Sequence, residues 1–385
     1  MDTTNPYALP AYDSMTPGAR KLRDFYAMKP GAGIFQQEFG FYVLERWQAE
    51  GHLPQTCDQV YLSELFGFDP PGHYSLGNLG WCEAGFCPAF EEKVLRTEGG
   101  YDFVQDFAGR TVKYFANRRN GFMPEYVGHP VTDMRTWEEQ CLWRMDPASP
   151  ERNPGIEESI VRAKQAAREG RIVTANLVGG YMYLRSLMGP VEVMYLFYDD
   201  PNLIHACMQA WFDLADAVLT RFQQHVTIDE VFLGEDICYN HGLLISDQMV
   251  RTFLFPYYAK LLDNVRARQL DKTRRLSFRL DTDGFSDVAI PLYQEIGMSY
   301  LCPFEVASGC DVVRTGRDYP ALLLSGGIDK RILAEGKTAI DREIDRVMPA
   351  MQKRGGYIPT CDHGVPEEVS FENYMHYRRR MLAFA

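Results

Sequence analysis

The chain has 385 residues, of which 46% are hydrophobic and 13% aromatic, so it can bury a large core and is neither disordered nor fibrous. Its 40 lysine and arginine residues stand against 52 aspartate and glutamate residues, and the formal net charge of -12 argues against nucleic acid as a partner. No apolar run approaches the roughly 20 residues of a membrane helix, and residues 1–6 lack the regions of a signal peptide, so we expect a cytoplasmic protein without a membrane partner.

The first 150 residues are irregular and rich in Gly, Pro, Tyr and Trp. Residues 33–50 form an amphipathic segment, and residues 101–114 have the alternation of a strand pair joined by a hairpin. Cys82 and Cys87 form a C-x4-C pair without the second half of a structural zinc site, so we expect a turn with two small buried side chains. We interpret residues 1–150 as a cap or extension that also contains early barrel elements.

From about residue 155 the sequence alternates helical periodicity with short β-rich runs. The pattern predicts helices over 156–170, 201–224, 246–269, 286–296 and 337–353. It predicts strands over 171–178, 229–236, 276–284, 298–305, 321–329 and 356–364.

Strands separated by helices imply right-handed crossovers and a parallel sheet, and six such units in a row favour a barrel over a nucleotide-binding fold. The sequence also contains no G-x-G-x-x-G and no Walker loop. We therefore predict an α/β protein with a (β/α)8 TIM barrel and an irregular N-terminal extension. Residues 151–385 form the main part of the barrel, in one structural domain overall.

Catalytic side chains of such barrels stand at the C-terminal ends of the strands, where this sequence places acidic residues. Glu235 and Asp236 are adjacent at one strand end, so one can face the barrel axis while its neighbour fixes a loop. We predict both as catalytic candidates; the alternative is that one of them caps the next turn.

Asp281 and Asp283 alternate at the end of the next strand and could enter one pocket, where they would repel each other, raise a pKa, or share a metal or cation. A turn stabilised by their side chains before Gly284 is the alternative. We predict Asp283 as catalytic and Asp281 as a metal ligand.

Cys361 and His363 follow the last predicted strand. Histidine suits proton transfer near neutral pH, and a thiolate is a soft ligand for zinc or another divalent metal. His363 is therefore predicted as catalytic and Cys361 as a metal ligand, although such a pair is also compatible with simple packing.

Two further acidic residues end the intervening strands, and three more side chains lie at strand ends or in a βα loop. Asp329 follows two glycines, which permit a close backbone approach to a ligand, but it could instead form a local charge cluster with its neighbours. We predict the following as substrate contacts: Tyr181, Arg185, Tyr239, Glu305 and Asp329.

With these residues identified, the C-terminal half resembles the uroporphyrinogen decarboxylase superfamily, which also contains corrinoid-dependent methyltransferases. The resemblance covers roughly residues 35–385. It is carried by LMGP (187–190), GED (234–236), GLLIS (242–246), FPYY (255–258), DTDG (281–284), PFEV (303–306), GGIDK (326–330) and DHGVP (362–366). It implies a (β/α)8 barrel with its site at the strand ends, and it makes a homodimer an expectation.

In the decarboxylases of this superfamily a histidine followed by glycine near the C terminus lies in the active site, and His363-Gly364 matches it. Those enzymes also carry an arginine-rich segment near the N terminus that binds porphyrinogen carboxylates. This chain has no counterpart of that segment, which argues against a substrate with eight carboxylates.

In the methyltransferase branch, a His-x-Cys motif and a later cysteine hold zinc, which activates the methyl acceptor. At the matching places this chain has Asp281, Asp283 and Cys361, so the resemblance leaves open zinc, a harder divalent metal, or no metal. The chain looks most like the uncharacterised members that carry an Asp-Ser-Asp-Gly motif instead.

The leading hypothesis is a methyltransferase or demethylase that moves a methyl group from a small substrate to a corrinoid, carried on a partner protein, or to a thiol acceptor. The first alternative is a decarboxylase of a porphyrinogen or smaller acid that needs no cofactor. The second is a barrel that only binds its ligand or partner; the convergence of charged groups at one barrel mouth favours the two enzymatic hypotheses.

Overall fold

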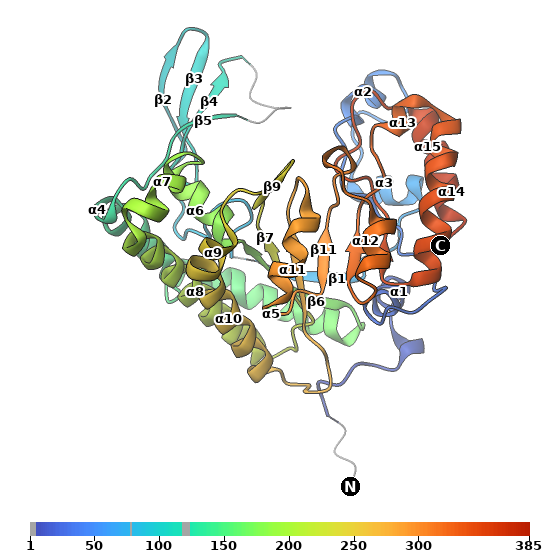
Figure 1. The fold of residues 1–385 in the computed structure, drawn as a ribbon, viewed down its shortest axis with the longest axis horizontal. Coiled ribbons are helices and arrows are strands. Elements are labelled where there is room, and N and C mark those ends of the chain that lie inside the picture. Colours follow the sequence, from blue (N-terminus) through green and yellow to red (C-terminus); the bar gives the residue numbers. More distant parts are fainter. Residues whose placement is uncertain (1–4, 78, 118–123) are drawn as a thin grey trace.

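The computed structural model describes residues 5–77, 79–117 and 124–385. Its centre is a curled sheet of seven strands, all of whose neighbours pair in parallel, in the order β1, β6, β7, β10, β11, β12, β13 (Figure 1). Their bounds are β1 His73–Leu76, β6 Ile172–Val178, β7 Glu230–Gly234, β10 Ser277–Asp281, β11 Tyr300–Cys302, β12 Leu323–Ser325 and β13 Tyr357–Ile358. The prediction of a parallel α/β sheet is confirmed.

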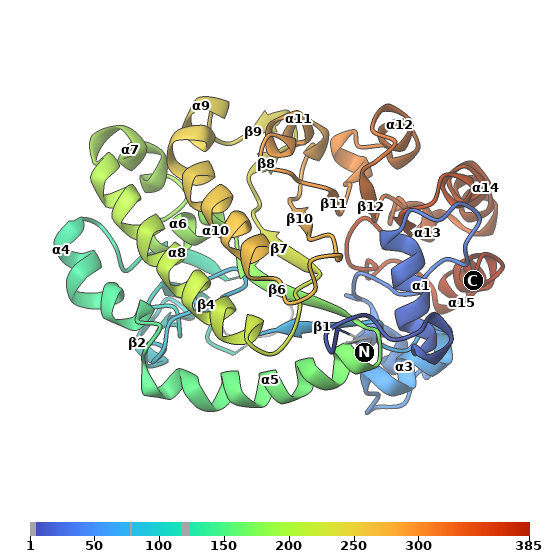
Figure 2. The same ribbon diagram turned by 90° about the horizontal axis from the view of Figure 1, so that it is seen from below.

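Helices surround the outer side of this sheet in an arc, which is seen from below in Figure 2. Their bounds are α5 Asn153–Arg168, α6 Gly180–Met188, α7 Glu192–Asp199, α8 Pro201–Gln223, α9 Asp247–Met249, α10 Phe255–Arg268, α11 Ala289–Gln294, α12 Val312–Asp318, α13 Ile332–Glu335, α14 Lys337–Arg354 and α15 Phe371–Leu382. The helix predicted over 246–269 is interrupted by the π-helical turn Val250–Leu254. In the described part of the chain no helix is long and apolar enough to cross a membrane.

The helices that cover the outer face explain the apolar side chains at alternate positions of the strands. In β6 six of the seven residues are buried, because helices cover the outer face and neighbouring strands cover the edges. The helix that precedes β7 starts where the sequence predicts: the Asp200 side chain accepts a hydrogen bond of 3.1 Å from the backbone N–H of Leu203, and Pro201 occupies the first turn.

The predicted eighth strand is not seen: within the described residues, β1 and β13 remain the two edges of the sheet. Residues 34–41 run near these edges, and Phe41 and Val365 form an isolated parallel bridge. The Asp69 carboxylate accepts the backbone N–H of Gln36 at 2.7 Å. The Asp69 side chain therefore occupies the backbone N–H of Gln36, which in a regular strand would donate to the adjacent strand.

The N-terminal region contributes one strand, β1, to the central sheet and otherwise forms separate elements. These are α1 Pro17–Tyr26, α2 Leu44–Ala49, α3 Gln59–Phe66, α4 Met134–Thr136, and the antiparallel sheet of β2 Lys93–Glu98, β3 Tyr101–Gln105, β4 Thr111–Phe115 and β5 Glu125–Gly128. This sheet projects from the body at the upper left of Figure 1. The predicted hairpin is confirmed as β3 and β4, whereas the amphipathic segment 33–50 is helical only in α2.

Candidate active site

His363 and Asp283, both predicted as catalytic, meet at the C-terminal ends of β13 and β10. His363 Nε2 lies 3.9 Å from Asp283 Oδ2. The backbone N–H of Gly364 donates to His363 Nδ1 at 2.9 Å, so Nδ1 is an acceptor and the neutral ring carries its proton on Nε2. The hydroxyl of Tyr42 also contacts Nδ1, at 3.0 Å. These contacts orient the proton of the imidazole toward Asp283.

Asp283 stands in an acidic environment that favours its protonated form. Burial raises the pKa of Asp283 to about 7, with further contributions from Asp236, Glu305 and Asp281. Burial also raises the pKa of Asp281 to about 6, and the Cys302 thiol donates to Asp281 Oδ2 at 3.2 Å. A carboxyl group with a pKa near 7 can both give and take a proton at neutral pH.

Asp236 faces the site, as expected for one member of the adjacent pair. Its Oδ1 accepts the backbone N–H of Asp283 at 3.3 Å, and Arg185 Nη2 lies 3.5 Å from its Oδ2. The backbone of Asp236 has φ 42°, a left-handed conformation that is strained for a residue with a side chain. Strain of this kind persists where surrounding structure holds a side chain in one position.

Glu235, the other member, points to the opposite side of the sheet. It is 0% exposed, and its carboxylate accepts hydrogen bonds from the hydroxyls of Tyr258 on α10, at 2.8 and 2.9 Å, and Tyr293 on α11, at 3.2 Å. Burial raises its pKa to about 7. The prediction of a catalytic Glu235 therefore finds no support in its position, because hydroxyls of two helices outside the sheet bind its carboxylate.

Lys330 supplies a cation that the sequence reasoning missed, although GGIDK was among the motifs used. Its Nζ lies 3.5 Å from Glu305 Oε1 and 3.9 Å from Asp362 Oδ1. Glu305 Oε2 also accepts the backbone N–H of Gly284 at 2.9 Å, which ties the end of β11 to the loop after β10. Glu305, predicted as a substrate contact, thus lies in the same cluster as Asp283.

Opposite charges near His363 give a first testable prediction. Burial lowers the pKa of His363, Lys330 lowers it further and Glu305 raises it. Lys330→Met should therefore raise the pKa of His363 and Glu305→Gln should lower it, as measured by NMR titration of the imidazole. Shifts of the same sign in both variants would contradict the charge arrangement described above.

Three other predicted substrate contacts lie differently from expectation. Asp329 is bound to Arg331 at 2.8 and 2.9 Å, the local charge cluster that was the alternative for it. Tyr181 is 1% exposed, and its hydroxyl faces Met194 Sδ at 3.8 Å. Tyr239, at the end of the short strand β8 (Cys238–Tyr239), is 47% exposed, and its backbone lies against Gly284, next to Asp283. The glycines before Asp329 approach protein rather than open space, since a Cβ at Gly326 would lie 1.8 Å from a backbone oxygen.

The metal ligands predicted from the sequence do not come together in this structure. Asp281 is engaged with the Cys302 thiol, whereas Cys361 is fully buried and its backbone N–H donates to Glu38 Oε1 at 2.8 Å. Burial raises the pKa of the Cys361 thiol well above its ordinary value, which disfavours the thiolate that binds metal. Among the described residues no three His, Cys, Asp or Glu side chains are grouped so as to hold a metal ion. The donor set therefore does not fit a metal.

Two aromatic side chains complete the site from a distant part of the sequence. The Phe39 ring lies 4.7 Å from the His363 ring, and Tyr42 stacks on it at 5.8 Å between centroids. Their separation from His363 along the chain exceeds 300 residues, so no local pattern could reveal the contact. The bridge between Phe41 and Val365 brings the two segments together.

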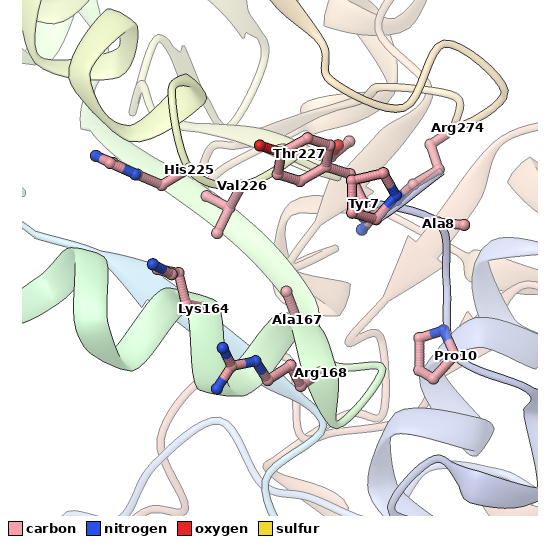
Figure 3. A pocket seen from close by; sticks show the side chains of 11 residues that line it. Tyr7, Ala8, Pro10, Lys164, Ala167, Arg168, His225, Val226, Thr227 and Arg274 are labelled. Atoms are coloured by element: carbon pink, nitrogen blue, oxygen red, sulfur yellow. The ribbon is translucent and has the colours of Figure 1, made fainter. Parts of the chain in front are cut away.

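Two cavities lie at opposite ends of the sheet. One, of about 360 Å³, opens beside the carboxylate cluster and is lined by Arg185, Asp236, Cys82, Arg110 and Tyr126, among others. The other, of about 350 Å³, lies at the N-terminal ends of the strands, where Lys164 and Arg168 of α5, the segment before β7 and Tyr7 line it (Figure 3). Parallel α/β barrels carry their catalytic groups at the C-terminal strand ends, which is the end where the first cavity opens.

The raised carboxyl pKa values predict an unusual dependence of stability on pH. A carboxyl group whose pKa is raised from 3.8 to about 7 binds its proton more tightly in the native state, so its stabilising effect is present at low pH and is lost as pH rises toward 7. Asp283→Asn removes the titrating group, and with it this decrease in stability with rising pH. The stability of the variant relative to wild type should therefore increase between about pH 4 and about pH 8, measured by urea unfolding.

Asp329→Asn is the matched control for this experiment. Although burial opposes it, Arg331 holds the pKa of Asp329 below its ordinary value of 3.8, so this variant should lose stability relative to wild type only as pH rises through the acid range below about 4, and should show no further change up to about pH 8. The same trend in both variants would contradict the assignment.

Comparison with known proteins identifies a family and several similar folds. The sequence profile of the family described as uroporphyrinogen decarboxylase (URO-D) matches residues 121–380. Among solved structures, a methyltransferase from Methanosarcina mazei is similar with a TM-score of 0.58 at 12% identity, covering 96% of this chain and 99% of that one.

Two more solved structures are much less similar. A putative vitamin-B12 independent methionine synthase from Listeria monocytogenes has a TM-score of 0.32 at 14% identity, covering 60% of this chain and 69% of its own. Xylanase B from Clostridium stercorarium F9 has a TM-score of 0.31 at 12% identity, covering 56% of this chain and 74% of its own. No curated protein matches the sequence. Likeness at these identities concerns the fold alone, and the two lower scores carry no argument.

Proposed function

Because this chain belongs to the uroporphyrinogen decarboxylase (URO-D) family, we propose that it is an enzyme in which Asp283 and His363 transfer a proton to or from a small bound substrate. The observation that carries the proposal is the approach of His363 Nε2 to Asp283 Oδ2, at 3.9 Å. Burial raises the pKa of this same Asp283 carboxyl group to about 7. Proton donors with such a pKa are effective near neutral pH.

The reaction we propose is methyl transfer from a small methylated compound to a corrinoid on a partner protein or to a thiol. The acceptor supplies the electron pair for the new bond to the methyl carbon. The bond from that carbon to the substrate's heteroatom breaks, and its electron pair remains on the heteroatom. Protonated Asp283 then gives its proton to this atom and takes up another from solvent, while His363 Nε2–H faces the Asp283 carboxylate and stabilises its charge in the interval. A corrinoid acceptor would have to arrive in its reduced cobalt(I) state, which carries the electron pair; no further metal is assigned to these steps, since the described donor set does not fit one.

Decarboxylation without a cofactor is the second candidate, and the raised pKa of Asp283 supports it as well. Loss of carbon dioxide leaves an electron pair on carbon, and a carboxylic acid that is protonated near neutral pH can deliver the proton that this carbon needs. The two candidates share the same donor and differ in the bond that breaks.

The test is to incubate the protein with O-, N- and S-methyl donors and cobalamin or a thiol as acceptor, and to measure equilibrium binding of cobalamin. Methyl transfer that is lost in Asp283→Asn supports the first candidate. Release of carbon dioxide from carboxylic acids that persists in chelator supports the second. Wild type that is inactive in all of these assays contradicts the proposal.

Two coarser expectations belong to the same proposal. The family resemblance makes a closed (β/α)8 barrel the expected architecture, with residues 34–41 in the place of the eighth strand. The backbone N–H of Tyr42 donates to the Val365 carbonyl at 2.9 Å and that of Val365 to the Gly40 carbonyl at 2.9 Å, which supports this position. A cytoplasmic homodimer remains the expected state.

A further inference from the structure

The interior of the central sheet is polar where a barrel normally packs branched aliphatic side chains in layers. Inward-facing positions are occupied by Ser75 on β1, Thr174 and Asn176 on β6, Glu230 on β7, and Arg279 and Asp281 on β10. A cavity of about 370 Å³ lies among them, within the size range of small-molecule sites. Departure from the usual packing pattern marks functional positions in natural proteins.

Arg279 is the cation of this cavity, and it is held in place by aromatic rings rather than by an ion pair. Its guanidinium carbon lies 4.9 Å from the ring centroid of Phe232 and 4.6 Å from that of Tyr300, its register neighbours on β7 and β11. Nε donates to Cys302 Sγ at 3.1 Å. Among the described residues Nη1 and Nη2 have no hydrogen-bond acceptor and no carboxylate within 4.0 Å, although Glu230 and Asp281 are near enough to raise the pKa of the guanidinium.

The acidic groups of the cavity are engaged with other partners, which explains why they do not pair with Arg279. Glu230 accepts hydrogen bonds from the hydroxyls of Tyr26 and Thr174, the latter at 3.3 Å. Cys302 separates Arg279 from Asp281, because its sulfur accepts from the guanidinium and its thiol donates to the carboxylate. Glu38 accepts from the backbone of Cys361 at 2.8 Å.

A guanidinium with unused donors in a cavity is costly unless a ligand completes its hydrogen bonds. The paired Nη atoms match the two oxygens of a carboxylate, and such bidentate pairs are stronger than neutral hydrogen bonds. Aromatic rings of Trp81 and Phe232, stacked at 5.4 Å between centroids, flank the space. The environment thus offers one cationic anchor and an apolar wall.

We propose that this cavity binds the carboxylate of a small organic acid through Arg279. The proposal deepens the function proposed above and rests on it only for the fate of the bound molecule. Phe39 and Asp281 line the cavity, and Phe39 also contacts His363, at 4.7 Å between ring centroids, so the cavity adjoins the residues next to the proposed catalytic pair. The substrate class is therefore a small monocarboxylic acid with an apolar body.

The test is binding of benzoate at neutral pH, measured by calorimetry or by ligand-observed NMR, beside its uncharged analogue benzamide. Wild type should bind benzoate at least about tenfold more tightly than benzamide, and Arg279→Met should weaken benzoate binding by about tenfold or more. Arg96→Met is the control, since Arg96 also stacks on a ring, that of Phe103 at 3.8 Å, but on the exposed strand β2.

Asn176→Leu provides a second variant if Arg279→Met fails to fold. It narrows the cavity from β6, two strands away from Arg279, without changing charge, and it should also weaken benzoate binding. Wild type that binds neither benzoate nor acetate, or binding equally strong in the cavity variants, overturns the proposal.

Asp283→Asn separates this inference from the proposed function. The variant should lose turnover and keep benzoate binding. If wild type shows neither methyl transfer nor decarboxylation but binds benzoate through Arg279, the carboxylate-binding site stands and the proposed reaction is wrong.

Discussion

Asp283→Asn is expected to lower kcat by about 100- to 10,000-fold, the usual contribution of a positioned general acid or base. The substitution keeps the shape of the side chain but removes the proton that the carboxyl group holds up to a pKa of about 7. KM should change far less than kcat, because the loss falls on the transition state rather than on binding. The measurement is steady-state kinetics of methyl transfer or decarboxylation across pH.

His363→Ala tests whether the two residues act as a pair. Each single variant should lose activity, and the double variant should lose little more than the worse single one, since groups that act as a unit are not additive. Asp263→Asn is the control for the loss of a negative charge: Asp263 is exposed on α10 and pairs with Arg266 at 2.9 Å. Full activity in Asp283→Asn would remove Asp283 from the mechanism.

Gly326→Ala is expected to destabilise the protein by about 3 kcal/mol or more. Gly326 follows β12 with φ 94°, and a Cβ there would lie 1.8 Å from the Pro303 carbonyl oxygen. A backbone atom cannot move away as a flexible side chain can, so the loop after β11 would have to shift. The expected measurement is a lower midpoint in urea unfolding, with loss of activity because this loop carries Glu305.

Gly336→Ala is the matched control for backbone strain. Gly336 has φ 110°, and nothing lies within 4 Å of a Cβ added there. This variant should cost only the strain of an unfavourable backbone conformation, about 1 to 3 kcal/mol. Equal losses in the two variants would show that the close approach to Pro303 contributes nothing.

The comparison of sequence and structure is clearest at the adjacent carboxylates after β7. The sequence placed both at the end of an apolar strand, and the alternation of side chains predicted that one would face inward. It could not tell which, because that choice depends on the backbone of Asp236, whose φ is 42°. The Glu235 carboxylate accepts hydrogen bonds from two tyrosine hydroxyls, one on α10 and one on α11, and only the packing of these helices places the hydroxyls next to it.

Periodicity and residue type determined the order of helices and strands after residue 155, the hairpin of β3 and β4, and the gathering of Asp283, Glu305 and His363 at one end of the sheet. These features follow from local geometry, since parallel strands carry their C-terminal residues to the same edge. The tertiary structure alone decided that Cys361 is buried away from Asp281, that Phe39 and Tyr42 flank His363, and that Arg279 faces a cavity. Those relations join segments distant along the chain, and they depend on side-chain packing that no local pattern encodes.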